Sequence, residues 1–225
     1  MTPSTSTTSL TKVFSGDCVK IMPTMRAESA DLIVTDPPYL CRYLDRSGRS
    51  IANDDRDDWL APAFRHMFRL LKQNTFCVSF YGWHYADKFI HAWREAGFRI
   101  VEHFAFVKRY DSSCRYVRHR HEQAYLLAKG IPPVPACIPM DVMEWQYSGN
   151  KLHPTQKPLN ILSELILAFS QPGAHVLDPF CGSGSTLVAA RDLGRSATGI
   201  EIDPAYARVA EQRLGCALPA QSKAA

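Results

Sequence analysis

The sequence contains no apolar run that approaches the ~18 residues a transmembrane helix needs, so we expect no membrane span. It also contains no C-x-x-C pair. Its cysteines are odd in number and scattered, at Cys18, Cys41, Cys77, Cys114, Cys137, Cys181 and Cys216. Zinc sites and disulfide frameworks bring cysteines together in patterns, so we expect neither, and free thiols suit a reducing cytosol.

A strong charge of one sign and internal repeats are also absent, and we expect no signal peptide. The 225 residues are 46% hydrophobic, which is enough for the core of one domain, and carry a net charge of +4. This mild basicity permits a polyanionic partner without requiring one. Residues 1–11 are rich in Ser and Thr and lack an apolar segment, and residues 217–225 are similar. We expect two disordered tails around a single domain over residues 12–216.

Residues 36–39, Asp-Pro-Pro-Tyr, follow the apolar run 32–35, which is typical of a buried parallel strand. Proline cannot donate to a sheet, so the pair ends the strand. A carboxylate, a carbonyl and an aromatic ring are thereby predicted at the carboxyl end of a strand, where open α/β sheets bind ligands.

This tetrad suits chemistry at a planar exocyclic amine, whose lone pair is delocalised into its ring. Two acceptors on the amine hydrogens, the Asp36 carboxylate and the Pro37 carbonyl, would free that lone pair. Neither Pro37 nor Pro38 adds a competing N–H, and Tyr39 can stack on the ring. The alternative is a plain strand-ending turn with a capping aspartate.

A second pattern, Asp-Pro-Phe-Cys-Gly-Ser-Gly-Ser-Thr over residues 178–186, follows another short apolar strand. Its glycines let the backbone turn tightly and approach a ligand. Glu201 ends the next strand, about 20 residues on, the spacing of a ribose-binding acid in nucleotide-binding units. The third glycine of the dinucleotide fingerprint is missing, which argues against a nicotinamide enzyme.

A third pattern, His-Pro-Thr-Gln-Lys-Pro over residues 153–158, opens the predicted helix 159–169. We expect Pro158 in the first turn, where proline is tolerated. Helix N-terminal amides together with Thr155, Gln156 and Lys157 can hold a carboxylate. The alternative is a capped helix start with a surface lysine.

Together the three patterns resemble the S-adenosylmethionine-dependent amino methyltransferases of DNA. The tetrad precedes the glycine pattern, as in the β class of that family, and the resemblance runs from about Val13 to Leu214. It implies a doubly wound α/β fold, a Rossmann-like and mostly parallel sheet with permuted motif order. Strands at 99–108 and 123–128 add an antiparallel hairpin at one sheet edge.

The resemblance also implies roles for individual residues. The catalytic set is Asp36, Pro37, Pro38 and Tyr39. The cofactor set is Asp17, Cys18, Asp36, Thr155, Gln156, Lys157, Asp178, Phe180, Cys181, Gly182, Ser183, Gly184, Ser185, Thr186, Glu201 and Ile202. Within it Glu201 would hold the ribose, and Asp17 serves equally well as a helix N-cap. No metal is expected, because His119 and His121 have no evident third ligand.

DNA contacts are expected from three loops, 40–58, 109–121 and 130–152, although each could be plain solvated surface. The basic residues singled out are Arg42, Arg109, Arg115, Arg118 and Arg120. The interval 130–152, where the family often carries a target-recognition domain, is short and irregular. We also expect Asp58 to cap a helix over 59–72.

The function predicted is methyl transfer to adenine N6 of a base flipped out of double-stranded DNA in the cytoplasm, at the nucleoid. Asp rather than Ser at position 36 favours adenine by the family's tendency. Cytosine N4 methylation, an RNA or protein methyltransferase and a catalytically idle nucleic-acid-binding relative are the alternatives. A homodimer is possible, and the target site, any restriction partner and any preference for hemimethylated DNA are left open.

Overall fold

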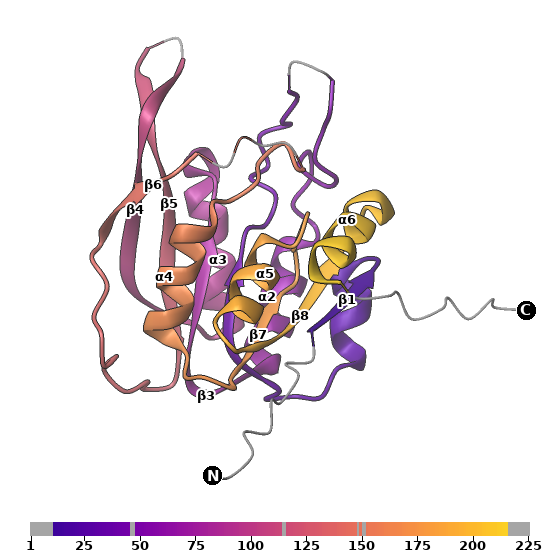
Figure 1. Ribbon diagram of the computed structural model, residues 1–225, viewed down its shortest axis with the longest axis vertical. Helices are drawn as coiled ribbons and strands as arrows, with labels where there is room; N and C mark the ends of the chain where they lie inside the picture. The colour runs from indigo at the N-terminus through magenta and orange to yellow at the C-terminus, as the bar shows by residue number, and fades with distance from the viewer. Residues whose placement is uncertain (1–10, 46–47, 114–115, 148, 150–151, 216–225) are drawn as a thin grey trace, which may run out of the picture.

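The computed structural model describes residues 11–45, 48–113, 116–147, 149 and 152–215, so both predicted tails lie almost wholly outside them. Eight strands in this part of the chain form one sheet in the order β1-β8-β7-β2-β3-β5-β4-β6. The pairs from β1 to β3 are parallel, β5 runs antiparallel to β3 and β4, and β6 is parallel to β4. The predicted doubly wound, mostly parallel fold is confirmed (Figure 1).

The elements alternate along the chain as the apolar patterns predict. The strands are β1 Thr11–Ser15, β2 Ala30–Thr35, β3 Leu71–Phe80, β4 Arg99–Ser113, β5 Arg118–Lys129, β6 Val142–Trp145, β7 His175–Asp178 and β8 Ser196–Glu201. The helices are α1 Cys18–Ile21, η1 Met22–Thr24, α2 Leu60–Leu70, η2 Trp83–Tyr85, α3 Ala86–Ala96, α4 Leu159–Phe169, α5 Ser185–Asp192 and α6 Pro204–Leu214. No helix in these ranges has the length and apolarity to cross a bilayer.

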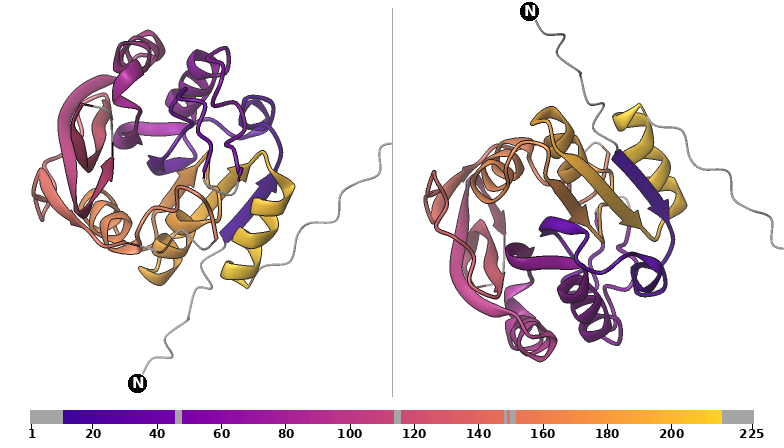
Figure 2. Two further views of the ribbon diagram at one scale, coloured as in Figure 1. Left: turned by 90° about the horizontal axis from the view of Figure 1, so that it is seen from above. Right: turned by 90° about the horizontal axis from the view of Figure 1, so that it is seen from below.

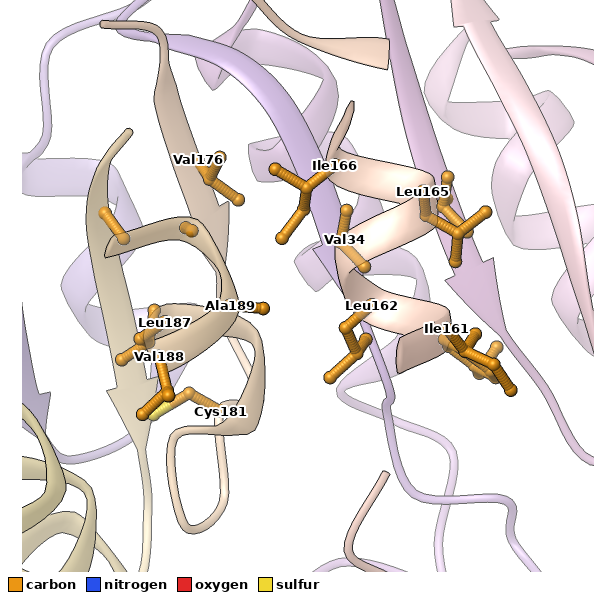
Figure 3. Packing of buried hydrophobic residues seen from close by; sticks show 14 of the residues in the cluster. Val34, Ile161, Leu162, Leu165, Ile166, Val176, Cys181, Leu187, Val188 and Ala189 are labelled. Carbon is orange, nitrogen blue, oxygen red and sulfur yellow. The ribbon is translucent and has the colours of Figure 1, made fainter. Parts of the chain in front are cut away.

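Helices cover both faces of the sheet, because successive residues of a strand point to opposite sides. Leu32 and Val34 of β2 join a core cluster with α4, α5 and α6, whereas Ile33 joins a second cluster with α1, α2 and α3. Figure 2 shows these two helix groups on opposite sides of the sheet. Figure 3 shows Val34 and Val176 packed under α4 and α5.

Two local predictions around α2 were wrong. The helix ends at Leu70, and β3 begins at Leu71, because Leu71 pairs with Ala30 of β2 and is buried there. Asp58 does not cap the helix: the N-cap is Trp59, without a side-chain hydrogen bond, and Asp58 instead forms an exposed ion pair with Arg56. The side chains of Asp17 and Asp203 do cap helices, α1 and α6, because they accept hydrogen bonds from the Val19 and Ala205 amides.

The hairpin of β4 and β5 is longer than predicted. Most of the basic stretch 109–121 lies in the paired ends of these strands rather than in a loop. The interval 130–152 is not wholly irregular, because Val142–Trp145 forms β6 on the outer side of β4. Buried and exposed residues alternate over only four positions in β6, which is too short a pattern to identify the strand from the sequence. The hairpin ends and the 40–58 loop project at the same end of the molecule (Figure 1).

Candidate functional site

A cavity of about 690 Å³ lies at the carboxyl ends of the parallel strands, and all three sequence patterns line it. It contains the whole predicted catalytic set and every member of the predicted cofactor set except Gly184. Gly184 is the N-cap of α5 at φ +81°, and a Cβ there would lie 2.9 Å from the Cβ of Ala210. The structure therefore assigns Gly184 to a turn and to helix packing rather than to the cavity wall.

Asp36 follows the last residue of β2, and its carboxylate is held by a lysine from a distant segment. Lys157 Nζ donates to Asp36 Oδ2 over 2.6 Å. Burial raises the pKa of Asp36, and the charge and hydrogen bond of Lys157, with a smaller effect of the nearby Tyr39 hydroxyl, partly offset that rise. Asp36 Oδ1 and the Tyr39 hydroxyl are buried and have no aligned hydrogen bond within the described residues. The site thus offers an acceptor whose lone pairs the protein does not fully use.

Lys157 itself is only 7% exposed, and its ammonium is surrounded by rings. Its Nζ lies 5.2 Å from the ring centre of Tyr39, 5.1 Å from that of Phe80 and 5.9 Å from that of Trp145. Aromatic faces attract a cation, so these rings and Asp36 together keep the ammonium in a desolvated place. Sequence reasoning grouped Lys157 with Thr155 and Gln156, and did not foresee its bond to Asp36.

The glycine loop is tied to Glu201 of β8. Glu201 Oε2 accepts from the Gly182 amide and Oε1 accepts from the Asp203 amide, each over 2.8 Å. Asp178, at the end of β7, accepts from the Phe180 amide over 3.1 Å, and burial raises the pKa of Asp178 to about 7. Glu201, the acid predicted to hold the ribose, therefore also fixes the glycine loop that faces the cavity. At another part of the cavity wall, the ring of Tyr206 lies edge-on to that of His153, with 4.4 Å between the ring centres.

The 40–58 loop is folded around a buried acid rather than being open surface. Asp54, 2% exposed, accepts from the backbone amides of Cys41 and Tyr43. Trp59 then closes the loop: its indole donates to the Asn53 and Arg56 carbonyls, and its ring lies 5.2 Å from Phe180. Trp59 is a cavity residue that sequence reasoning missed, since the pattern indicated only that it begins the helix over 59–72.

Among the arginines proposed for DNA contact, those that the structure describes do not line the cavity. Arg109 pairs with Glu144, while Arg118 and Arg120 both pair with Asp111, at 3.4 and 3.3 Å. The three side chains remain largely exposed, and exposed pairs of this kind separate readily. Arg42 is exposed in the 40–58 loop, and Arg115 lies outside the described residues.

The far wall of the cavity holds three more residues that sequence reasoning did not select. Lys108 and Glu122 form an ion pair there, beside the indole of Trp145. A signal was present in the sequence for Lys108, which continues the alternate positions of Phe104 and Phe106, whereas Glu122 follows the polar run 118–121 and gave none. No group of three His, Cys, Asp or Glu side chains suited to a metal occurs in the ranges that the structure covers.

Comparison with known proteins agrees with this arrangement. The family model for DNA methylases matches residues 30–212. YubD of Escherichia coli (strain K12), named as a methylase, is 49% identical over 96% of this chain and 95% of its own. The Type II methyltransferase M2.DpnII of Streptococcus pneumoniae is 29% identical over 88% of this chain and 87% of its own.

Solved structures show the same fold. The M1.HpyAVI–SAM complex superposes with a TM-score of 0.73 at 23% identity, over 91% of this chain and 99% of that one. PvuII DNA methyltransferase (cytosine-N4-specific) gives 0.74 at 20% identity, over 91% and 88%. The family match spans the tetrad, the glycine loop and the segment between them, so the chain belongs to the DNA methylase family, with the motif order of its β class.

Proposed function

We propose that the protein transfers the methyl group of S-adenosylmethionine to N6 of an adenine turned out of double-stranded DNA. The observation that carries this proposal is the Asp36 carboxylate at the end of β2. It faces the same cavity as the glycine loop, and one of its oxygens has no aligned hydrogen bond. An exocyclic amine needs such an acceptor, because its lone pair is otherwise delocalised into the base.

The residues of the cavity fit S-adenosylmethionine, which supplies an electrophilic methyl group when bound. Glu201, 9% exposed, offers carboxylate lone pairs toward ribose hydroxyls while it holds the Gly182 amide. Thr155, Gln156 and Lys157 line the cavity where a methionine carboxylate would be held. Phe180, Trp59 and Asp17 also line the cavity, and they present aromatic and acceptor groups suited to an adenine ring.

Asp36 and Pro37 act by orienting the amine. The Asp36 carboxylate and the Pro37 carbonyl accept its two hydrogens, which draws the nitrogen toward tetrahedral geometry, and Tyr39 stacks on the base. Asp36 does not need to be a strong base, since the amine becomes acidic only as it acquires the methyl group. Holding nucleophile and methyl in line supplies a large part of the rate, up to about 7–11 kcal/mol of barrier in favourable cases.

The DNA must deform for this chemistry, because N6 is engaged in base pairing inside the duplex. The ends of β4 and β5 carry Arg109, Arg118 and Arg120, and the 40–58 loop carries Arg42. The strand ends and the loop project at one end of the molecule (Figure 1) and can contact phosphates on either side of an extruded base. We infer a single domain over 12–216 that acts on DNA in the cytoplasm.

Cytosine N4 methylation is the second candidate. PvuII DNA methyltransferase, which shares the fold, is cytosine-N4-specific by name. An acceptor pair at the end of β2 suits either amine. The aspartate at position 36 supports adenine by the family's tendency.

Incubation of DNA with labelled S-adenosylmethionine, followed by digestion and mass analysis, tests the proposal. RNA runs in parallel, and Asp36→Asn serves as the inactive control. Label in N6-methyladenine of DNA is the expected result. Label in N4-methylcytosine would identify cytosine as the target base and leave the proposed mechanism unchanged. Label in RNA, or none with cofactor bound, would overturn the proposed function.

A further inference from the structure

The far wall of the cavity, built by Lys108, Glu122 and Trp145, stands out because it breaks the pattern of its strands. Phe104 and Phe106 precede Lys108 on the same buried face of β4, where alternation calls for another apolar residue. Glu122 similarly precedes Ala124 on the core face of β5. A charged pair set into an apolar face costs desolvation energy, so its presence calls for an explanation beyond packing.

The three residues meet through the sheet. Lys108 of β4 is the direct neighbour of Trp145 in β6, and its ammonium lies 5.4 Å from the Trp145 ring centre. The same ammonium forms an ion pair with Glu122 of β5. Trp145 is 6% exposed, and its indole N–H is buried beside the Tyr110 side chain. All three residues line the cavity, so this wall presents an ammonium, a carboxylate and an indole.

The strand order places this wall and the glycine loop on opposite sides of β2. The glycine loop follows β7, and Glu201 is the last residue of β8, so both lie on one side of β2 in the sheet. Lys108, Glu122 and Trp145 lie on β4, β5 and β6, on the other side of β2. Because the Asp36 amine site lies at the end of β2, a cofactor on the β7 and β8 side leaves the opposite side to the body of the base.

Other ligands for Lys108 fit less well. Its side chain is 9% exposed, which excludes it from contact with DNA phosphates, whereas Arg109 beside it is 83% exposed. A structural role alone does not account for a charged pair at the cavity surface. Lys129 shows what such a role looks like: at the other end of β5 it pairs with Glu28 and the Leu71 carbonyl, away from the cavity.

We propose, on the basis of the function given above, that Lys108 is a specificity-determining residue that donates a hydrogen bond to a ring nitrogen of the extruded base. Glu122 and Trp145 are positioning residues that hold the ammonium toward that nitrogen. Adenine presents N1 and N7 beside N6, and both accept. A deaza analogue, in which C–H replaces one ring nitrogen, loses that acceptor and keeps nearly the same shape as adenine.

The test compares kcat/KM on duplexes that carry adenine, 1-deazaadenine or 7-deazaadenine at the mapped target. The wild-type protein should lose about 10- to 100-fold on one analogue, the scale of a missing hydrogen bond to a charged group. Lys108→Met should lose a similar factor on adenine and show no further loss on that analogue. Lys129→Met, which removes a matched buried lysine away from the cavity, should discriminate as the wild type does.

Two further variants guard against a folding defect. Lys108→Met with Glu122→Gln leaves no unpaired charge and should behave as Lys108→Met. Glu122→Gln alone should keep discrimination, because the Gln amide oxygen still accepts from the ammonium and holds the donor in place. Cofactor binding measured by calorimetry should be unchanged in all of them. Equal discrimination by Lys108→Met and wild type would overturn the inference alone. Absence of adenine label from the wild type would overturn the proposed function as well.

Discussion

Lys157 Nζ lies 2.6 Å from Asp36 Oδ2, although the two residues are 121 positions apart in the chain. Lys157 belongs to the pattern over residues 153–158, which suits binding of a carboxylate, and Asp36 belongs to the tetrad 36–39, which suits binding of an amine. Their contact makes the lysine a partner of the acceptor that the chemistry needs. It keeps Asp36 more readily ionised than burial alone would allow, because it lowers a pKa that burial raises. The lysine therefore joins the two halves of the site.

Replacement of Asp36 by Ala or Asn should abolish methyl transfer and leave cofactor affinity within a few-fold of the wild type. The reason is that Asn replaces a carboxylate acceptor by an amide, and Ala removes it. Transfer to DNA and calorimetric titration of the cofactor measure the two effects. Loss of cofactor binding in both variants would show that Asp36 belongs mainly to the cofactor site.

Replacement of Lys157 by Met should shift the acid limb of the pH–rate profile to higher pH. Asp36 must be ionised to accept the amine hydrogens, so activity falls as pH drops through its pKa, which burial raises. Lys157 opposes that rise, and its removal lets the pKa climb further. The profile of kcat/KM across the acid and neutral range measures this. Lys129→Met is the control, and an unmoved limb in Lys157→Met would contradict the coupling.

Gly82→Ala should lower kcat/KM about tenfold or more with a modest loss of stability, about 1–3 kcal/mol. Gly82 has φ −82°, which any residue tolerates, but a Cβ there would lie 2.7 Å from both the Cβ and the carbonyl oxygen of Tyr39. The substitution must therefore displace the tetrad. Gly173→Ala, at φ +80° with open space around it, should cost stability only. Equal activity in both variants would place the effect elsewhere.

Glu201→Ala should weaken cofactor binding more than DNA binding. The variant loses a carboxylate in the cavity and also frees the Gly182 and Asp203 amides, so the glycine loop loses its anchor. Calorimetry with the cofactor and a DNA shift assay separate the two affinities. An unchanged cofactor Kd would rule out the ribose role.

Replacement of Arg115, Arg118 and Arg120 by Gln should flatten the salt dependence of DNA binding. Each arginine that no longer neutralises a phosphate reduces the slope of log K against log salt by about one. Filter binding over a range of salt concentrations measures the slope. Arg65→Gln, which removes an arginine with a similar exposed ion pair on α2, is the matched control. Equal slopes in both variants would place the phosphate surface elsewhere.

Local chemistry made much of this protein predictable. The proline pair after an apolar run fixed the position of Asp36 at a strand end, and glycines after Asp178 indicated a tight turn before a helix. Both signals act through the backbone within a few residues, so at these two sites they did not depend on distant contacts. The alternation of strands and helices, which buries both faces of a sheet, likewise determined the fold class.

Tertiary structure alone decided which of these pieces touch. The Asp36–Lys157 bond joins residues 121 positions apart, and the Lys108–Glu122 pair depends on the register of the β4–β5 hairpin, and periodicity carries no information about either contact. The same holds for Gly184, whose nearest neighbour is Ala210 on α6. The sequence thus determined which chemical groups the site contains. The order of the strands determined how these groups meet, because only tertiary packing brings charged side chains from different segments together in a largely buried position.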